Sequence, residues 1–475
     1  MKIAILGFGR EGKAILKFLK KSARYKNAKI SILDRKISKP PHQIRMGAFS
    51  TKKIKSLLWC GGKDYLKNLA EFDVVFRSPG VPYNLPEIQN AIKPRSRASS
   101  LRGKKGVKFS GGTDLFFNEI SKIVRHDSPQ VIGITGTKGK GTTSTLLYKI
   151  LKAAKKDVYL AGNIGKPALE ILPKLKKNSI VILELSSFQL QDLKHSPDIA
   201  VVLNIFEDHL DSHKNFKEYA ESKANIAKWQ KKTDKIFYDA NNKWSKWIAQ
   251  KSPAKKIPVN SSLSNSREWF HKIKSIIKIP GEHNLKNAVM AATVAKSLGI
   301  PENIILKTVK NYRGMEHRLE LVHSNILKNV GMNFYNDSAS TNPYTAAAAI
   351  RAFPNQPKIL ICGGKDKNLD YTPLAKALKN SNTKLVILFG ENKEKIAKTI
   401  LRIKNNELRI INVKNLNDAV KLAHKTAKLF IIHNSIRQPA DIIHIIFSPA
   451  AASFDMFKDY KDRGDKFKKI VKGLK

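Results

Sequence analysis

The sequence predicts an α/β protein of three domains, each built on a mostly parallel β-sheet. Two strand–glycine turn–helix units, near residues 2–19 and 131–150, support this fold, and strands alternate with helices over the last third of the chain. At 475 residues the chain has room for about three domains of roughly 150 residues. We place a Rossmann-like domain at 1–106, a P-loop domain at 107–314 and a second Rossmann-like domain at 315–475.

The first domain opens with a pattern typical of nucleotide-binding folds. A strand at residues 2–6 leads into Gly7-Phe8-Gly9-Arg10-Glu11-Gly12, which opens a helix, and a second strand at 30–33 ends in Asp34 and Arg35. Glycines allow the backbone to approach a diphosphate closely, and the helix N-terminus attracts its charge. The order predicts a site for a nucleotide or its diphosphate.

A further strand of this domain, at residues 73–76, runs into Ser78-Pro79-Gly80. Ligands of open α/β sheets bind at the carboxyl ends of the strands, so Ser78 and Gly80 are candidate binding residues. The polar and basic residues 93–105 read as a linker to the next domain.

The second domain begins with the most informative stretch, residues 131–143. An apolar strand ends in Gly136-Thr137-Lys138-Gly139-Lys140-Gly141, and Thr142 and Thr143 open a helix. Backbone N–H groups of such a turn bind phosphates, the lysine reaches the terminal phosphates, and one of the two threonine hydroxyls holds Mg²⁺. The strict P-loop spelling is not met, because Ile134 replaces its first glycine and Gly141 separates the lysine from its threonine. The alternative is an ordinary glycine-rich turn.

Two more apolar runs of this domain end in polar clusters. The run at 179–185 delivers Glu184, Ser186 and Gln189, and the run at 199–205 precedes His209. Continuous apolar runs are typical of buried parallel strands, and carboxylates at their ends suit Mg²⁺. Considered alone, Glu184 could equally be a helix cap, and His209 could equally be a histidine in a surface loop.

The third domain alternates strand-like residues 359–362, 385–389, 409–413 and 442–447 with helix-like segments. Its polar turns follow these strands, so we expect them to gather at one end of the sheet. No internal repeat or long low-complexity segment is visible.

Composition narrows the class of protein. Cys60 and Cys362 are the only cysteines, too few for a disulfide framework or a zinc cluster. Neither a signal peptide nor a run of roughly 18 apolar residues is visible, so we expect a cytoplasmic protein with no membrane association. The net charge of +50 is spread along the chain without an aromatic-interleaved basic module, which favours a lysine-rich surface and anionic substrates over a nucleic-acid partner.

The assembled motifs resemble the Mur ligase family along essentially the whole chain. The most specific pieces are Ser78-Pro79-Gly80, Gly162-Asn163-Ile164-Gly165, residues 184–190, Gly281 to Asn287, Glu316-His317-Arg318 and residues 448–457. The pattern is most similar to the D-glutamate-adding branch. Another branch usually carries a histidine near Phe188, a third differs in the third-domain turn, and folylpolyglutamate synthases share the extra glycine at Gly141.

The resemblance implies a monomeric, ATP-dependent ligase that joins glutamate to UDP-N-acetylmuramoyl-L-alanine through an acyl phosphate. The first domain is then expected to bind UDP, the second ATP with two Mg²⁺ ions, and the third the amino acid. Lys140, His209 and Lys223 are the implied catalytic residues, and Lys223 lies where the family has a lysine carbamylated by CO₂. Without the resemblance, Lys223 reads as a solvated helix lysine.

The resemblance also assigns binding residues. They are, for ATP, Gly136, Thr137, Lys138, Gly139, Lys140, Gly141, Thr142, Thr143, Asn284, Asn287, Arg318 and Asp337; for the UDP substrate, Gly7, Gly9, Arg10, Asp34, Arg35, Ser78, Gly80, Asn163, Ser186 and Gln189; for the amino acid, Thr341, Lys367, Ser453, Phe454 and Tyr460; and for metal, Thr142, Glu184, His209 and carbamylated Lys223.

One departure from the family pattern bears on the amino acid. The third-domain turn of the family usually reads Asn-Asp-Ser-Lys-Ala-Thr-Asn, and here Ala339 replaces the lysine. Either a neighbouring base such as Lys365 compensates, or the amino-acid preference differs, for example toward L-glutamate. A polyglutamylating ligase is a further alternative, which the glycine pattern at residues 7–12 disfavours.

Overall fold

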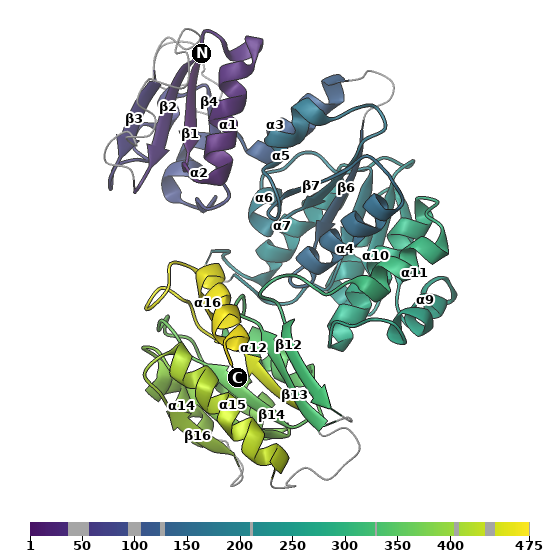
Figure 1. The fold of residues 1–475 in the computed structure, drawn as a ribbon. Helices are drawn as coiled ribbons and strands as arrows, with labels where there is room; N and C mark the ends of the chain where they lie inside the picture. The colour runs from purple at the N-terminus through teal and green to yellow at the C-terminus, as the bar shows by residue number, and fades with distance from the viewer. Residues whose placement is uncertain are drawn as a thin grey trace. The chain divides into compact units, whose positions relative to one another are not determined.

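The computed structural model describes residues 1–36, 57–93, 106–123, 129–209, 212–327, 330–402, 408–432 and 442–474. The chain folds as two compact units, residues 1–273 with 286–308, and residues 274–285 with 309–475. The described strands form three sheets, two in the first unit and one in the second (Figure 1).

The first sheet is parallel, with the order β3-β2-β1-β4-β5. Its strands are β1 (Lys2–Leu6), β2 (Lys29–Asp34), β3 (Leu57–Gly61), β4 (Val74–Arg77) and β5 (Lys108–Ser110), and its helices are α1 (Arg10–Lys21), α2 (Pro86–Ile92) and α3 (Gly112–Ile123), with short 3₁₀ turns at Ala23–Tyr25 and Leu69–Glu71. β5 follows the predicted boundary at residue 106 and yet belongs to this sheet. Most of the predicted linker, residues 94–105, lies outside the described residues.

The central sheet is also parallel, with the order β11-β10-β9-β6-β8-β7. Its strands are β6 (Gln130–Thr135), β7 (Val158–Gly162), β8 (Ile180–Glu184), β9 (Ile199–Val202), β10 (Lys235–Asp239) and β11 (Lys255–Val259). The helices of this part are α4 (Lys140–Ala153), α5 (Ala168–Ile171), α6 (Ser187–Leu190), α7 (Phe216–Lys228), α8 (Lys243–Gln250), α9 (Ser264–Lys274), α10 (Glu282–Ser297) and α11 (Glu302–Asn311), with a 3₁₀ turn at Leu172–Lys174.

The third sheet has the order β12-β13-β17-β14-β15-β16 and is parallel except for β12, which pairs antiparallel with β13. Its strands are β12 (Glu320–Leu327), β13 (Val330–Asn336), β14 (Lys358–Cys362), β15 (Thr383–Leu388), β16 (Arg409–Asn412) and β17 (Ile442–Phe447), and its helices are α12 (Pro343–Arg351), α13 (Thr372–Lys379), α14 (Lys393–Leu401), α15 (Leu416–Ile432) and α16 (Tyr460–Lys472). The sequence motifs did not predict the antiparallel β12–β13 pair.

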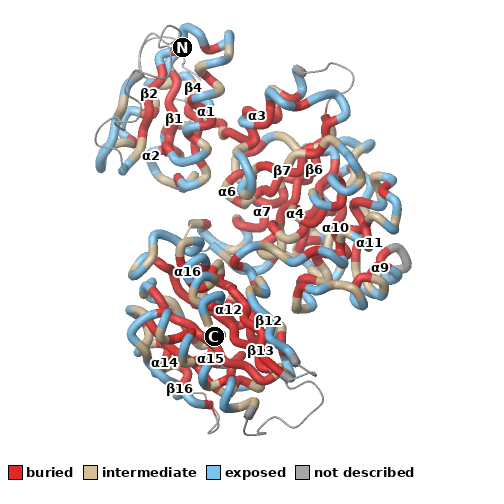
Figure 2. The backbone as a smooth tube through the Cα atoms, viewed as in Figure 1, coloured by how far each residue is buried: buried red, intermediate tan, exposed pale blue. Residues whose placement is uncertain are grey.

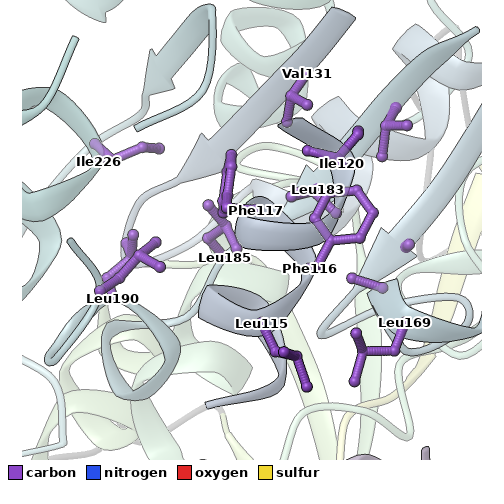
Figure 3. Packing of buried hydrophobic residues seen from close by; sticks show 14 of the residues in the cluster. Leu115, Phe116, Phe117, Ile120, Val131, Leu169, Leu183, Leu185, Leu190 and Ile226 are labelled. Atoms are coloured by element: carbon purple, nitrogen blue, oxygen red, sulfur yellow. The ribbon is translucent and has the colours of Figure 1, made fainter. Parts of the chain in front are cut away.

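Apolar burial on both faces explains why these strands read as continuous hydrophobic runs. β8 and β9 are buried along nearly their whole lengths, and the red interior of each sheet in Figure 2 follows the strands. One apolar cluster runs from Ile3 and Ile15 through Phe116 to Leu183 and Ile226, so the first two sheets share a continuous core. Figure 3 shows α3 contributing Phe116, beside Leu183.

The structure confirms the predicted α/β class and the strands predicted from apolar runs. The predicted strand at residues 2–6 is β1, the run at 179–185 contains β8, and the last predicted strand at 442–447 is β17. Among the helices in the described part of the chain, none is long and apolar enough to cross a bilayer.

Candidate active site

The glycine-rich turn connects β6 to α4 at the carboxyl edge of the central sheet. β6 pairs with β8 on one side and β9 on the other, all parallel. The segments that follow these strands therefore meet at one edge, and Thr137 N–H donates to the Asn204 carbonyl at 2.8 Å. The Thr137 hydroxyl also contacts the Tyr219 hydroxyl of α7 at 3.0 Å, which fixes the turn against that helix.

Gly139 is required by the geometry of this turn. Its φ of +86° is a left-handed conformation that side chains other than hydrogen disfavour. A Cβ atom at this position would lie 2.2 Å from Oδ1 of Asn287 on α10. The absence of a side chain at Gly139 therefore allows Asn287 to approach the turn, and the two predicted ATP-binding residues are neighbours.

Lys140 begins α4 and its ammonium lies over the turn. Its Nζ donates to the carbonyls of Gly136 at 2.9 Å and Thr137 at 3.0 Å. Lys138 turns toward the segment after β9, where its Nζ forms an ion pair with Asp208 at 2.9 Å. Thr142 is half-buried in the first turn of α4, and Gly141 and Thr143 are buried. The predicted P-loop residues thus form one continuous turn.

Glu184, the last residue of β8, lies beside this turn on the neighbouring strand. Its side chain is 5% exposed, and Oε1 accepts a hydrogen bond from Nδ2 of Asn163 at 2.8 Å. Oε2 is buried and accepts no hydrogen bond from the residues that the structure describes. A buried carboxylate oxygen with an open coordination position suits a divalent cation, so Glu184 and the Thr142 hydroxyl fit an Mg²⁺ site.

Lys223 of α7 is buried, at 1% exposure, although helix lysines are normally solvated. Its Nζ donates to the Gly136 carbonyl at 3.0 Å and lies 4.8 Å from the centre of the Tyr219 ring. Burial, and next the Lys140 ammonium, lower the pKa of Lys223 well below its usual range. A neutral amine is the form that reacts with CO₂, so the environment fits the predicted carbamylation.

His209 follows β9 in a left-handed conformation, with φ of +56°. Its ring packs against Phe188 and Tyr219, with Nε2 3.8 Å from the Asp208 carboxylate. Within the described residues, no group of three or more His, Cys, Asp or Glu side chains is assembled for a metal.

The turn after β1 is built from residues of three strands. Gly7 N–H donates to the Leu33 carbonyl at 2.8 Å, and Ser78 Oγ donates to the Gly7 carbonyl at 2.7 Å. Asp34 accepts from the Phe8 N–H at 2.6 Å, so its carboxylate braces the turn. The structure thus brings Gly7, Asp34 and Ser78 together, as the sequence predicted.

The remaining predicted residues of this turn are accessible. Gly9, Arg10, Arg35 and Gly80 are exposed. The Arg10 guanidinium donates to the Gly165 carbonyl at 2.5 Å, which links the first glycine turn to the segment after β7. An arginine and exposed backbone at a helix N-terminus can bind a diphosphate.

Ser186 and Gln189 form a capping box at the start of α6. The Gln189 N–H donates to Ser186 Oγ at 3.3 Å, and the Ser186 N–H donates to Gln189 Oε1 at 3.0 Å. This reciprocal pair holds a one-turn helix in place directly after Glu184. The sequence suggested that Glu184 itself was a possible cap, and the structure assigns that task to Ser186.

A pocket lies beside Asn287, between the segments that follow β9, β10 and β11. These strands lie on one side of β6 in the sheet, and β8, which carries Glu184, lies on the other. It is lined by Leu203, Asn204, Asp239, Asn241, Val259, Asn260, Phe270, Lys286, Asn287 and Met290. Apolar walls with a few amide and charged groups suit a nucleobase and ribose. Of this set, Asn287 was assigned a binding role from the sequence, and Lys286 lies beside it in the same Gly281 to Asn287 motif.

In the second unit, Asp337 is the centre of a buried polar network. Its carboxylate accepts from Ser448 Oγ at 2.7 Å and from the Leu319 N–H at 3.2 Å, and burial raises its pKa to about 7. Arg318, the adjacent predicted nucleotide-binding residue, is exposed. Asn284 begins α10 in this unit and donates to the Pro280 carbonyl at 2.7 Å.

Four of the predicted amino-acid-binding residues lie on turns after β13, β14 and β17, and the fifth, Tyr460, begins α16. Lys367 Nζ is 5.8 Å from the centre of the exposed Phe454 ring. Ser453 is buried, Thr341 is partly exposed and Tyr460 is exposed. Lys365, the suggested substitute for the missing lysine, instead pairs with Glu391 at 2.5 Å. The structure therefore gathers a cation, hydroxyls and aromatic rings at one edge of the third sheet.

The side chain of Arg463 connects two of these turns, a role that the sequence did not predict. Its side chain is fully buried and donates to Ser338 Oγ at 3.1 Å, to the Ser338 carbonyl at 2.9 Å, and to the carbonyls of Ala451 at 3.0 Å and Ala452 at 3.1 Å. One guanidinium thus fixes the turn that carries Thr341 against the turn that carries Ser453.

We expect Arg463→Met to lower the free energy of unfolding of the second unit by about 3 kcal/mol or more, because three buried carbonyls lose their donor. Urea unfolding, monitored by far-ultraviolet circular dichroism, measures this change in the free energy of unfolding. Lys466→Met is the control, since Lys466 is an exposed residue of the same helix whose described contacts are the Asp462 carboxylate and the face of the Phe457 ring. Equal stability of the two variants would contradict the prediction.

Two family models match the chain: Mur ligase MurD-like, N-terminal domain, over residues 1–97, and Mur ligase middle domain, over residues 134–295. The UDP-N-acetylmuramoylalanine–D-glutamate ligase of Acetivibrio thermocellus is 32% identical, covering 95% of this chain and 97% of its own length. The enzyme of the same name from Clostridium tetani is 31% identical over 100% of this chain and 97% of its own.

Solved structures share the fold at lower identity. The UDP-N-acetylmuramate–alanine ligase MurC of Thermotoga maritima aligns over 100% of both chains with a TM-score of 0.55 and 16% identity. MurF ligase of Thermotoga maritima, solved with ADP, aligns over 79% of this chain and 88% of its own with a TM-score of 0.52 and 17% identity. The full-length match at 32% identity decides the assignment: the chain belongs to the Mur ligase family, whose members are ATP-dependent ligases that form carbon–nitrogen bonds.

Proposed function

We propose that this chain is a cytoplasmic, monomeric enzyme that adds D-glutamate to UDP-N-acetylmuramoyl-L-alanine in peptidoglycan precursor synthesis, with ATP and Mg²⁺. The observation that carries the proposal is the convergence of Lys140, Glu184 and Lys223 on the turn after β6. The full-length similarity to ligases of that name supports the substrate assignment, and the MurD-like match over residues 1–97 favours a UDP substrate over a folate.

The reaction needs an activated carboxylate, because direct attack by an amine would have to expel oxide. A carboxylate oxygen of the alanine end attacks the γ-phosphorus of ATP, the bond to the ADP oxygen breaks, and an acyl phosphate forms. The glutamate amine then attacks the acyl carbon and loses a proton, and inorganic phosphate leaves. Positioning and neutralisation of charge supply most of the catalysis in such steps.

The residues of the central sheet match these demands. The Lys140 ammonium and the backbone N–H groups of its turn would hold the terminal phosphates. Glu184 and Thr142 would hold Mg²⁺, which neutralises phosphate charge when bound; His209 and a carbamylated Lys223 are the candidates for a second ion. Carbamylation would turn Lys223 from a cation into a carboxylate-like ligand.

The residues of the second unit are proposed to bind the amino acid and close on the nucleotide. Lys367 would pair with a glutamate carboxylate, and Thr341, Ser453, Phe454 and Tyr460 would form the rest of that pocket. Arg318 and Asp337 would contact ATP. A second candidate function is a ligase of the same kind that uses a different amino acid, such as L-glutamate. Ala339 supports it, because the pocket then has one lysine fewer than the family pattern.

Phosphate release measures activity and donor together. We expect ATP-dependent phosphate release with UDP-N-acetylmuramoyl-L-alanine and D-glutamate, and much less with L-glutamate, D-aspartate or L-alanine. UDP-N-acetylmuramic acid without the alanine serves as the acceptor control. A strong preference for another amino acid would reassign the donor and leave the ligase chemistry intact.

We predict that Ala339→Lys is tolerated and does not raise KM for D-glutamate. Ala339 is partly exposed, and its N–H bond to the His317 carbonyl at 2.9 Å involves only the backbone. A restored cation near the phosphates could contribute about 1–3 kcal/mol to binding if it forms a charged hydrogen bond. Steady-state kinetics with both glutamate enantiomers tests this, and a large loss of activity would mean that this turn is built for another ligand.

A further inference from the structure

Arg77 occupies an unusual position between the first two sheets. It is the last residue of β4 and directly precedes Ser78, and its side chain is 2% exposed. The guanidinium makes four hydrogen bonds: Nε and Nη2 to the Asp192 carboxylate at 3.3 and 3.1 Å, Nη1 to the Val81 carbonyl at 2.7 Å, and Nη2 to the Phe188 carbonyl at 2.9 Å.

On one side, Arg77 fixes the turn that begins at Ser78. The Val81 carbonyl that it binds belongs to this turn, and the Val81 N–H donates to the Ser78 carbonyl at 3.0 Å. Ser78 Oγ in turn holds the Gly7 carbonyl. Three hydrogen bonds therefore lead from Arg77, through Val81 and Ser78, to the glycine turn proposed for the UDP diphosphate.

On the other side, Arg77 fixes α6. Phe188, whose carbonyl it binds, lies inside the one-turn helix that Ser186 and Gln189 cap, and Asp192 follows that helix. A four-residue helix has little stability of its own, so its place depends on such outside contacts. Ser186 and Gln189 are the residues proposed to meet the muramoyl end of the substrate.

Glu11 adds a second connection between the same two segments. It belongs to the first glycine turn and hydrogen-bonds the side chain of Gln189, and Arg77 lies close by. Burial raises the Glu11 pKa to about 7, an effect that Arg77 partly offsets and Asp192 reinforces. Glu11, Arg77, Pro79, Phe188 and Gln189 all line one small cavity.

We propose that Arg77 is a positioning residue that sets the UDP-binding turn and the Ser186–Gln189 segment at the separation needed by a ligand that spans both. The inference rests on the proposed function for the identity of that ligand. A lysine cannot replace the arginine, because one ammonium has no planar fork with which to hold a carboxylate and two carbonyls in fixed directions. Arg77 itself need not touch the substrate.

Two ligands separate positioning from general stability. Under the proposed function, UDP would contact the first glycine turn, whereas UDP-N-acetylmuramoyl-L-alanine would extend to the segment after Glu184. We expect Arg77→Lys and Asp192→Asn to raise the Kd of the longer ligand about tenfold or more, since misplacement by about 1 Å has effects of that order. The Kd of UDP, measured by the same calorimetry, should stay within about twofold of the wild-type value. KM for ATP should not change.

Asp114→Asn is the matched control. Asp114 also lines the cavity and pairs with His195 at 2.9 Å, but the hydrogen bonds described for it lead to Ser110 and Asn118. This variant should leave both Kd values unchanged. Using Asp192→Asn beside Arg77→Lys guards against a variant that fails to fold, because the asparagine keeps the shape of the carboxylate.

The outcomes are distinct. Equal shifts of both Kd values, or no shift of either, would overturn the positioning role, as would a wild-type protein that binds the longer ligand no better than UDP. Wild-type phosphate release with the proposed substrates is measured in parallel. Its absence would overturn the proposed function, while a selective change in the Kd of the longer ligand would still support the role of Arg77.

Discussion

Lys140→Ala should abolish ATP turnover while the protein remains folded. The Lys140 side chain is partly exposed on the turn after β6 and donates to the carbonyls of Gly136 and Thr137, so its loss should leave the packing of the core intact. A phosphoryl transfer that loses a fixed positive charge at the terminal phosphates should slow by about 10²–10³-fold or more. Phosphate release at saturating ATP measures the effect, and circular dichroism reports the fold.

Lys149→Ala provides the control for this prediction. Lys149 is an exposed lysine of the same helix, α4, so the variant changes the net charge equally without altering the turn. It should keep wild-type turnover. Near-normal turnover of folded Lys140→Ala would remove the basis for assigning residues 136–143 to phosphate binding.

The parts that the sequence predicted well depend on local patterns. Strand β6, the turn at residues 136–139 and helix α4 follow one another without interruption, so glycine spacing and an apolar run were enough to place Lys140. The same holds for β1, Gly7 and α1. In both cases the function of the turn comes from backbone groups that are adjacent in the chain.

The parts that it missed depend on contacts between distant residues. Arg77 meets Asp192 115 positions along the chain, and Arg463 meets Ser338 125 positions away. In a chain with 88 basic residues, a single arginine carries no local mark of burial. Phe270, which lines the pocket beside Asn287, was missed for the same reason: its neighbours are set by the packing of α9 and α10.

Lys223 lies between these cases. The sequence predicted that Lys223 lies on a helix, but a helix lysine in a lysine-rich chain is expected at the surface, and only the family resemblance singled it out. The structure places it inside, with its amine on the Gly136 carbonyl. Burial of an ammonium is costly without a role, so its position supports a function at the phosphate turn.

Lys223→Ala should therefore lose most activity, by about 10²-fold or more, if a carbamate at this position holds a second Mg²⁺. Acetate should restore part of the lost phosphate release, because its two oxygens resemble those of the carbamate and the alanine leaves space for it. Lys217→Ala is the control: Lys217 is an exposed lysine of the same helix, and acetate should not affect that variant.

Lys223→Arg distinguishes the two chemical roles open to this residue. Arginine keeps the positive charge but does not form a carbamate, so the variant should be as inactive as Lys223→Ala and should not respond to acetate. If arginine sustains turnover, Lys223 acts as a cation toward the phosphates and the carbamate is not needed. Mass spectrometry with gentle ionisation, on protein kept under CO₂, should detect the added mass of one CO₂ on the wild type but not on Lys223→Arg. If Lys223→Ala keeps wild-type activity, both roles are excluded. The buried amine of Lys223 would then contribute only to the packing of α7 against β6.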